Sequence, residues 1–401
     1  MKILYTFGGI PPYFDAQLNK LVQKGVDTVV VIPKGKSPVL GKGVKVIDSR
    51  NSTYQTIQTD EELSVFRKPY FPHLPDIIRT EKPDILVTVW PYFLQFFFQP
   101  ALRKVLKSTH TRFVIREIPF RVPPYGKVFS YFKKHRFFDE DMKLLNKGAG
   151  FILRQWITMQ IRRYCYKRAD GALAYASLGK ELMPTYGIAP EKVFVTYNSN
   201  NTDAMFSMKR ELSQKNNILK KSDYRIVHVG RLVKWKRVDL LIDAFSKIAP
   251  SFPRAELVVI GGGPEMENLK EQAVGLHLGE KVVFTGAIHD NETIAFYLSA
   301  SAIYVLAGMG GLSINDAMTF GLPVICSVCD GTEHDLVVPN KNGFFFEEND
   351  VDGLADKLLI LLKDPSLASR MGEESWKIIR DKVNLDTVSD RYINAYKNIL
   401  A

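Results

Sequence analysis

Residues 308–323 read GMGGLSINDAMTFGLP, a pattern that could hold an anion. Gly310 and Gly311 precede a predicted helix, whose first backbone N–H groups belong to Leu312 and Ser313. These donors would have no partner within the helix. Together with the helix dipole, such donors favour a phosphate group at the helix start.

Asp316 and two basic residues could bind the rest of a nucleotide diphosphate. Asp316 lies one turn into the predicted helix, where it could accept hydrogen bonds from ribose hydroxyls or simply stabilise the helix start by its charge. In GRLVKWKRVD, Arg231 follows a predicted strand and Lys236 lies five residues on. Arginine neutralises phosphate oxygens through a planar fork, and lysine acts as a point charge. The alternative for this basic loop is a solvated surface.

The segment VVIGGGPEMENL places three glycines between a predicted strand and a predicted helix. Gly262 and Gly263 would allow the backbone to approach a ligand closely, and Pro264 suits the first turn of a helix. The segment lacks the Lys-Ser/Thr ending of a P-loop, and a tight strand-to-helix turn is the alternative interpretation.

The elements that must position these residues alternate between strand and helix. The chain opens with a strand in MKILYTF, a Gly-Pro loop, an amphipathic helix that ends near Gly25 and a second strand in TVVVIP. Apolar strands recur in ILVTV, TRFVIRE, GALAYAS and KVFVTYNSN, and the same alternation starts again at YRIVHVGRL. Uninterrupted apolar strands separated by helices indicate an α/β fold with doubly wound parallel sheets.

A polar, lysine-rich stretch, SMKRELSQKNNILKKSDY, separates the two halves and is interpreted as a linker. We predict a Rossmann-like domain at residues 1–205, a second one at 206–380, and a terminal helix at 381–401 that packs back on the first domain. Two such halves are expected to face each other across a cleft, where the carboxyl edges of their sheets present loops to a ligand.

The composition narrows the class of protein. With 401 residues, 46% hydrophobic and 24% charged, the chain is expected to fold and not to be disordered. Its three cysteines are too few for a disulfide framework, and CSVC has no second pair or nearby histidine to complete a zinc site. We find no signal peptide and expect a reducing, cytoplasmic compartment. The apolar stretch ILVTVWPYFLQFFFQPAL is interrupted and too short for a membrane-spanning helix.

Five motifs together resemble the retaining GT-B glycosyltransferases, and glycosyltransferase family 4 (glycosyl transferases group 1) in particular. They are GRLVKWKRVDLLIDAF, VVIGGGPEMENLKEQA, VVFTGAI, GGLSINDAMTFGLPVICS and NGFFFEENDVDGLADKLLILLKD. The resemblance implies a GT-B fold, with the acceptor bound by residues 1–205 and a nucleotide-sugar donor bound by residues 206–380. It also implies sugar transfer with retention and without an obligatory metal, and no Asp-x-Asp motif is present.

The resemblance assigns roles to individual residues of the second half. Arg231 and Lys236 match the family's basic pair on the donor diphosphate. Asp316 matches the second glutamate of a Glu-x7-Glu motif, which binds ribose. The first glutamate falls on Gly308, so the sugar would be held by backbone groups or by the opposite domain. The turn expected to receive the distal phosphate consists of Gly311, Leu312 and Ser313.

In the first half the resemblance is looser. FGGIPPYF is similar to the family's N-terminal glycine loop, so Gly8 and Gly9 are expected to contact the acceptor or a phosphate. Many family members carry a histidine at the end of a middle strand, where this chain has Arg116 or Glu117. Glu117 could hold a sugar hydroxyl or the acceptor, and the alternative is an ion pair with Arg116 or Arg121.

The formal net charge of +11 comes from one region. Residues 101–170 contain 17 Lys and Arg against 5 Asp and Glu, interleaved with twelve aromatic residues. No nucleic-acid motif is present, so we expect no nucleic-acid partner. Two interpretations remain: a solvated basic face, and an anionic-membrane patch that includes Lys133, Lys134 and Arg136. The second interpretation would suit a lipid-linked or membrane-bound glycan acceptor.

We therefore predict a retaining glycosyltransferase at the cytoplasmic face of a membrane. It would move a sugar from a UDP- or GDP-linked donor to a glycan or lipid-linked glycan in cell-surface polysaccharide assembly, without a cofactor. Fixed positive groups would stabilise the leaving diphosphate. Two alternatives stay open: a catalytically weak homologue that binds nucleotide or glycan as a partner subunit, and a nucleotide-sugar epimerase.

Overall fold

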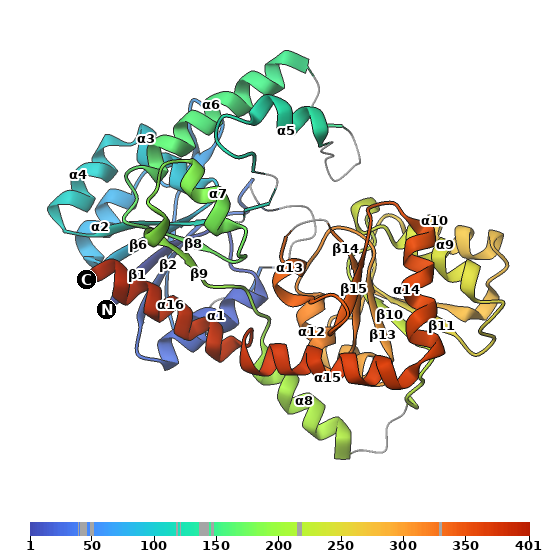
Figure 1. The fold of residues 1–401 in the computed structure, drawn as a ribbon. Coiled ribbons are helices and arrows are strands. Elements are labelled where there is room, and N and C mark those ends of the chain that lie inside the picture. Colours follow the sequence, from blue (N-terminus) through green and yellow to red (C-terminus); the bar gives the residue numbers. More distant parts are fainter. Residues whose placement is uncertain are drawn as a thin grey trace. The chain divides into compact units, whose positions relative to one another are not determined.

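The computed structural model describes residues 1–38, 40, 46–48, 52–117, 119–120, 122–135, 144–145, 148–214, 219–328 and 331–401. These residues form two compact units, each with its own parallel sheet (Figure 1). The first unit comprises Met1–Asn198 and Leu385–Ala401, and the second comprises Ser199–Asn384. The predicted α/β fold class is confirmed.

The first unit contains a seven-stranded parallel sheet with the order β3-β2-β1-β6-β7-β8-β9. The order reverses between β1 and β6, as in doubly wound folds. The strands are β1 (Lys2–Thr6), β2 (Asp27–Pro33), β3 (Gln55–Thr59), β6 (Ile85–Val89), β7 (Arg112–Glu117), β8 (Gly171–Ala174) and β9 (Val193–Val195), with a separate antiparallel pair β4 (Glu62–Leu63) and β5 (Pro69–Tyr70).

Helices flank this sheet, and the predicted apolar run at its centre is broken. The run forms β6, a 3-10 turn η2 and two short helices, because Pro91 and Pro100 interrupt it. Among the described residues, no helix is long and apolar enough to cross a membrane. The helices are α1 (Pro12–Gln23), α2 (Leu74–Glu81), η2 (Tyr92–Leu94), α3 (Gln95–Phe98), α4 (Pro100–Ser108), α5 (Val128–Lys134), α6 (Gly148–Tyr166), α7 (Gly179–Thr185), η3 (Pro190–Lys192) and α16 (Leu385–Leu400).

The C-terminal helix α16 completes the first unit by packing on α1, as Figure 1 shows. The contact is polar as well as apolar: Gln17 Nε2 donates to Ser389 Oγ at 2.9 Å, and the Tyr5 and Tyr396 hydroxyls pair in the interior. Lys24 Nζ lies 2.6 Å from an Asp390 oxygen. The helix that precedes α16 in the chain belongs to the second unit, so the returning segment starts later than the predicted residue 381.

The second unit has a six-stranded parallel sheet with the order β12-β11-β10-β13-β14-β15. Its strands are β10 (Arg225–Val229), β11 (Glu256–Ile260), β12 (Val282–Gly286), β13 (Ile303–Leu306), β14 (Val324–Ser327) and β15 (Gly343–Phe346). Its helices are α8 (Thr202–Gln214), η4 (Lys234–Lys236), α9 (Val238–Ile248), α10 (Met266–Gly275), η5 (Gly279–Lys281), α11 (Asn291–Ser299), α12 (Ser313–Thr319), α13 (Glu333–Leu336), α14 (Val351–Lys363) and α15 (Pro365–Asp381).

Helix α8 differs from the sequence interpretation, which treats much of it as linker and places a domain boundary at 205 and 206, inside the helix. Met205 and Leu212 are seven residues apart and both are buried, so one face of α8 is apolar despite its many polar residues. Lys209 Nζ also donates to the Thr319 carbonyl of α12 at 2.9 Å. These contacts make α8 part of the second unit.

Candidate functional site

The sheet order of the second unit brings two of the predicted segments together. Strands β10 and β13 are neighbours in the sheet, although β11, β12 and the helices around them separate the two strands in the chain. The loops that leave their carboxyl ends therefore lie side by side, at the point where the strand order reverses. The loop after β10 carries Arg231 and Lys236, and the loop after β13 carries residues 308–311.

Gly308 is the point of closest approach between these loops. A Cβ atom at this position would lie 2.2 Å from the Trp235 carbonyl oxygen and 2.6 Å from the Lys236 carbonyl carbon. The next residue, Met309, donates its backbone N–H to the same Trp235 oxygen at 2.8 Å. Only glycine fits such a contact, so the structure gives a packing reason for the lack of a carboxylate at residue 308.

Lys236 reaches across to the glycine turn. Its Nζ donates to the carbonyl oxygens of Met309 at 2.9 Å and Gly310 at 2.6 Å. A Cβ atom on Gly311 would lie 3.1 Å from Nζ, so the ammonium group is next to the turn predicted to receive a phosphate. Arg231 is exposed, with its guanidinium carbon 5.9 Å from the centre of the Trp235 ring.

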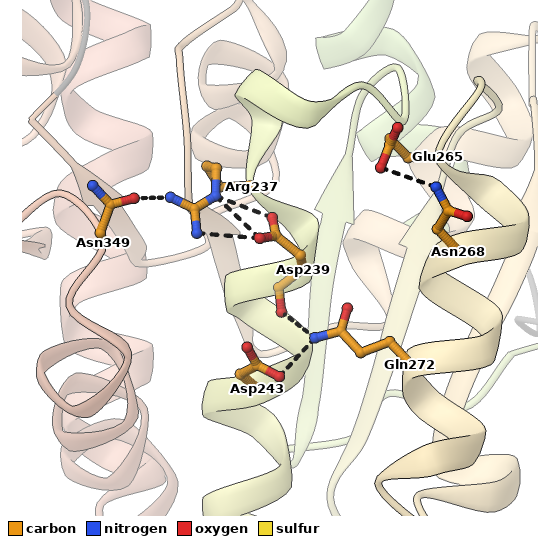
Figure 2. A network of polar contacts seen from close by, with 7 residues as sticks. All are labelled: Arg237, Asp239, Asp243, Glu265, Asn268, Gln272 and Asn349. Atoms are coloured by element: carbon orange, nitrogen blue, oxygen red, sulfur yellow. Dashed lines mark hydrogen bonds and ion pairs between the residues drawn. The ribbon is translucent and has the colours of Figure 1, made fainter. Parts of the chain in front are cut away.

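A polar network holds the residue after Lys236 in place (Figure 2). Arg237 has a left-handed backbone (φ 52°) at the start of α9, and its guanidinium contacts Asp239 at 3.1 Å and Asn349. Gln272 of α10 joins the network by donating to Asp243 Oδ1 at 2.6 Å. The network ties the end of the basic loop to α9, α10 and the loop before α14, which limits how Lys236 can move.

The glycine-rich segment after β11 packs against the backbone of the basic loop. A Cβ atom on Gly263 would lie 2.3 Å from the Leu232 carbonyl oxygen, and Leu232 N–H donates to the Gly262 carbonyl at 2.9 Å. The structure thus gives Gly262 and Gly263 a backbone-packing role, which corresponds to the tight-turn interpretation. Their predicted contact with a donor stays a prediction.

Helix α12 begins where the sequence predicts, with Leu312 as its N-cap residue and Ser313 as its first helical residue. Tyr304 lies on β13 with its side chain fully buried, and its hydroxyl donates to Ser313 Oγ at 2.7 Å. Burial raises the pKa of Tyr304 well above its usual value, so it stays a donor at physiological pH. The Ser313 hydroxyl is therefore fixed beside the glycine turn.

Asp316 has one satisfied oxygen and one buried oxygen without a partner. Asn200 Nδ2 donates to Asp316 Oδ2 at 2.7 Å and to the Leu312 carbonyl at 3.0 Å. The other oxygen, Oδ1, is buried and accepts no hydrogen bond from any residue that the structure describes. Burial raises the pKa of Asp316 to about 7, and the Asn200 hydrogen bond acts in the opposite direction. An unpaired buried acceptor costs free energy unless a donor reaches it, which marks a ligand position.

Sequence reasoning missed two residues of this site. Asn200 lies in the polar run YNSNN, which predicts only a loop, and nothing in the sequence links it to Asp316. His228 is fully buried on β10 with Nδ1 3.0 Å from the Val305 carbonyl oxygen, and its Nε2 has no partner. Burial, with a smaller effect of Lys236, lowers the pKa of His228 to about 4, so the ring is neutral at physiological pH.

In the first unit, Glu117 is enclosed by partners. Arg162 Nη1 donates to Oε1 at 2.5 Å and the Tyr166 hydroxyl donates to Oε2 at 2.6 Å. Glu117 and Arg162 are both buried, and the Arg162 guanidinium lies 4.5 Å from the centre of the Trp90 ring. Glu117 therefore forms an ion pair, but its partner is Arg162 and not Arg116, which donates to Tyr392. Arg121, the other predicted partner, is outside the described residues. A role for Glu117 toward substrate stays a prediction.

The N-terminal glycine loop lies between β1 and α1. Gly8 is buried, and a Cβ atom on Gly9 would lie 2.5 Å from Val46 Cγ1. A side chain at residue 9 would therefore require the Val46 side chain to shift. The structure holds nothing that tests an acceptor or phosphate at this loop.

The basic patch falls on the α5–α6 hairpin, whose two helices pack together (Figure 1). Lys133 and Lys134 are exposed at the end of α5, and Arg136 is outside the described residues. Three large apolar side chains of the same helices are also exposed: Phe129 (65%), Leu153 (57%) and Trp156 (42%).

Possible metal-binding side chains do not cluster in the part of the chain that the structure describes. Across the described ranges, no group of three or more His, Cys, Asp or Glu side chains is placed to hold a metal ion. Cys165 and Cys326 are buried, and Cys329 is outside the described ranges.

Solved structures share the fold of this chain. Anabaena HepE, solved in complex with UDP, aligns over 99% of this chain and 100% of its own with a TM-score of 0.70, at 16% identity. At that identity the likeness shows the fold alone. Two Rossmann-like parallel-sheet units with this topology make the GT-B fold of glycosyltransferases, as the sequence predicts.

The second unit also matches a family model. The match covers residues 209–377, and the model is described as glycosyl transferases group 1. An uncharacterized glycosyltransferase of Haemophilus influenzae is 30% identical over 192 residues, 47% of this chain and 52% of its own length. A GDP-mannose-dependent alpha-(1-6)-phosphatidylinositol monomannoside mannosyltransferase of Mycolicibacterium smegmatis is 30% identical over 156 residues, 37% of this chain and 41% of its own. The chain therefore spans about half the length of these relatives.

We predict that Gly308→Ala destabilises the second unit, because its Cβ atom would collide with the Trp235 carbonyl. Overpacking of this kind costs about 1–3 kcal/mol of unfolding free energy, to be measured by urea denaturation. Gly275→Ala is the matched control, since that glycine ends α10 with open space around it. Equal stability of the two variants would contradict the close contact between the loops.

We predict that Asp316→Asn changes the pH dependence of stability. The carboxyl ionises near 3.8 in the unfolded chain and near 7 in the folded protein. Between these values the folded state holds the extra proton, so native stability falls as pH rises toward 7. The stability of Asp316→Asn relative to the wild type should therefore increase by about 2 kcal/mol from pH 5 to pH 7.5. Urea denaturation at several pH values measures it.

The exposed Asp356 of α14 provides the control through Asp356→Asn, which removes a carboxylate from the surface and not from the interior. If the stability of Asp316→Asn depended on pH in the same way as that of this control, the result would contradict a buried carboxyl group at Asp316.

Proposed function

We propose that the protein is a retaining glycosyltransferase that uses a UDP- or GDP-linked sugar. The observation that carries this proposal is the Asp316 carboxylate, which has a buried oxygen without a partner one turn from a glycine loop that Lys236 contacts. A ribose supplies two hydroxyl donors for such an oxygen, and the diphosphate attached to it would lie toward the cations.

The roles of the site residues in this proposal follow from their chemistry. Arg231 and Lys236 would neutralise the diphosphate as it leaves, which is electrostatic stabilisation by groups already in position. Lys236 would exchange its contacts to the Met309 and Gly310 carbonyls for phosphate oxygens. The reaction would need neither a cofactor nor a metal ion, because these cations supply the positive charge.

Recognition of the donor sugar would differ from the Glu-x7-Glu pattern. Since residue 308 cannot carry a side chain without displacing residues 235 and 236, we propose that backbone groups of the 308–311 loop contact the sugar. The names of the relatives support both donor bases, because the structure of Anabaena HepE contains UDP and the Mycolicibacterium enzyme is GDP-mannose-dependent. The second name also includes a phosphatidylinositol acceptor, which supports a lipid-linked or glycan acceptor in cell-surface polysaccharide assembly.

Thermal-shift measurements with UDP and GDP test the donor site. We expect one of them to raise the melting temperature, as a ligand at 100 times its dissociation constant stabilises the native state by about 2.7 kcal/mol. Arg231→Ala and Lys236→Ala should each weaken nucleotide affinity at least tenfold, while Lys247→Ala, on the exposed side of α9, should not. No shift with either nucleotide would overturn the proposal.

Turnover decides between transfer and the two other functions that the sequence leaves open. Donor consumption that requires an acceptor and is lost in Lys236→Ala supports the transferase. Nucleotide binding without turnover would identify a partner subunit, and sugar isomerisation without an acceptor would identify an epimerase.

We also propose that the α5–α6 hairpin contacts the cytoplasmic face of an anionic membrane. Exposed lysines attract anionic headgroups, and exposed Phe and Trp side chains favour the interface between headgroups and acyl chains. On this hairpin, Lys133 is one helical turn from Phe129, and Leu153 and Trp156 lie three residues apart on α6. Charge and apolar surface therefore occur together, which a merely solvated basic face would not require.

Charge reversal tests the membrane proposal. Lys133→Glu with Lys134→Glu should weaken binding to phosphatidylglycerol vesicles at least tenfold, and added salt should weaken wild-type binding. The same double reversal at Lys104 and Lys107, exposed on α4, is the matched control. Equal vesicle binding by both double variants would contradict the assignment to this hairpin.

A further inference from the structure

Among the described residues, three arginines are almost fully buried, and only two of them have carboxylate partners. Arg162 is paired with Glu117, and Arg225 Nη2 lies 2.7 Å from Glu256 Oε1. The third, Arg116, is 6% exposed on β7, and no carboxylate of the described residues forms an ion pair with it. Within the described part of the chain, no carboxylate therefore neutralises the charge of Arg116.

The surroundings of Arg116 are aromatic and neutral. Its Nε donates to the Tyr392 hydroxyl at 2.8 Å, and its guanidinium carbon lies 4.4 Å from the centre of the Phe14 ring. Its Nη2 is buried and has no hydrogen-bond partner within the described ranges. The half-exposed Tyr13 and Tyr175 also lie close enough to interact with it electrostatically. Rings and hydroxyls stabilise a guanidinium partially, but none of them neutralises its charge.

Burial of an unpaired cation costs several kcal/mol, more than a neutral side chain of similar size would cost at the same place. The chain pairs its other buried arginines, so a lack of acidic residues does not explain the exception. An unpaired buried charge with an unused donor is the arrangement expected where the missing anion belongs to a ligand.

The position of Arg116 in the sheet supports this interpretation. Val89 of β6 pairs with Arg116, and Thr88 pairs with Thr6, so Arg116 is level with the residue that follows β1. The glycine loop of Gly8 and Gly9 leaves the sheet at this same carboxyl edge, where doubly wound folds bind their ligands.

We propose that Arg116 is the centre of an oxyanion site in the first unit, which binds a phosphoryl or carboxylate group of a substrate. The guanidinium plane donates to the oxyanion from Nη2, while Tyr392 and Phe14 hold the plane in position. The residues of this site belong to the first unit, whereas the residues assigned to the nucleotide belong to the second. Its existence does not depend on the proposed donor.

Anion titration tests this site in the full-length chain that carries Arg231→Ala and Lys236→Ala, so that the second unit does not respond to phosphate. Inorganic phosphate and D-glucuronate are compared with chloride at matched ionic strength, and the melting temperature is followed. We expect phosphate, glucuronate or both to raise it, and the anion that acts identifies the phosphoryl or carboxylate class. Arg116→Met should weaken that anion's affinity at least tenfold, with Arg116→Lys between the two.

Tyr396→Phe is the matched control, because it removes another buried hydroxyl of the same helix, one that pairs with the Tyr5 hydroxyl. It should bind the anion within threefold of the parent. Without anion, Arg116→Met should melt no lower than the parent, since an unpaired buried charge is removed.

Two results would overturn the proposal. One is that neither anion shifts the parent. The other is that Arg116→Met binds them as the parent does. A chain that fails these tests but still binds UDP or GDP at wild-type residues 231 and 236 would leave the donor proposal intact, so the two failures are distinguishable.

Discussion

The contact between the loops after β10 and β13 is the constraint on which the second unit's site depends. Gly308 lies against the Trp235 carbonyl, and this places Lys236 beside the Gly310 carbonyl. A side chain at residue 308 would separate the loops and withdraw the ammonium group from the turn. The glycine that seemed a loss of function in the motif is thus what allows the cation and the turn to meet.

A second constraint is the enclosed carboxyl of Asp316. Asn200 satisfies one oxygen, and the other is buried without a donor among the described residues, so the ionised carboxylate carries a cost that a donor from a ligand would relieve. Arg116 in the first unit is in a similar situation with the opposite charge. It is a buried cation, and its Nη2 has no acceptor among the described residues. In both units the polar group left incomplete lies near the carboxyl edge of a parallel sheet, where doubly wound folds bind ligands.

The sequence predicts the sheets and most helices because apolar runs and their breaks report burial directly. It also predicts that the segments containing Lys236 and Asp316 contribute to one site, since neighbouring strands of such a sheet follow from the fold. It could not predict contacts between distant side chains, such as Asn200 with Asp316 or Arg162 with Glu117, because no local pattern encodes them. The sequence of α8 predicts a linker, because its few apolar residues are spread along a segment that is otherwise polar.

We propose that Asp316 Oδ1 accepts a hydrogen bond from a hydroxyl group of the ligand. The pH dependence of nucleotide affinity tests this most directly. Hydroxyl donors favour the ionised carboxylate, so affinity for UDP or GDP should rise with pH and level off above about 7, the pKa of Asp316. Asp316→Asn should lose this step and keep any step that comes from the nucleotide's own phosphate. An identical pH profile in the wild type and Asp316→Asn would contradict the account.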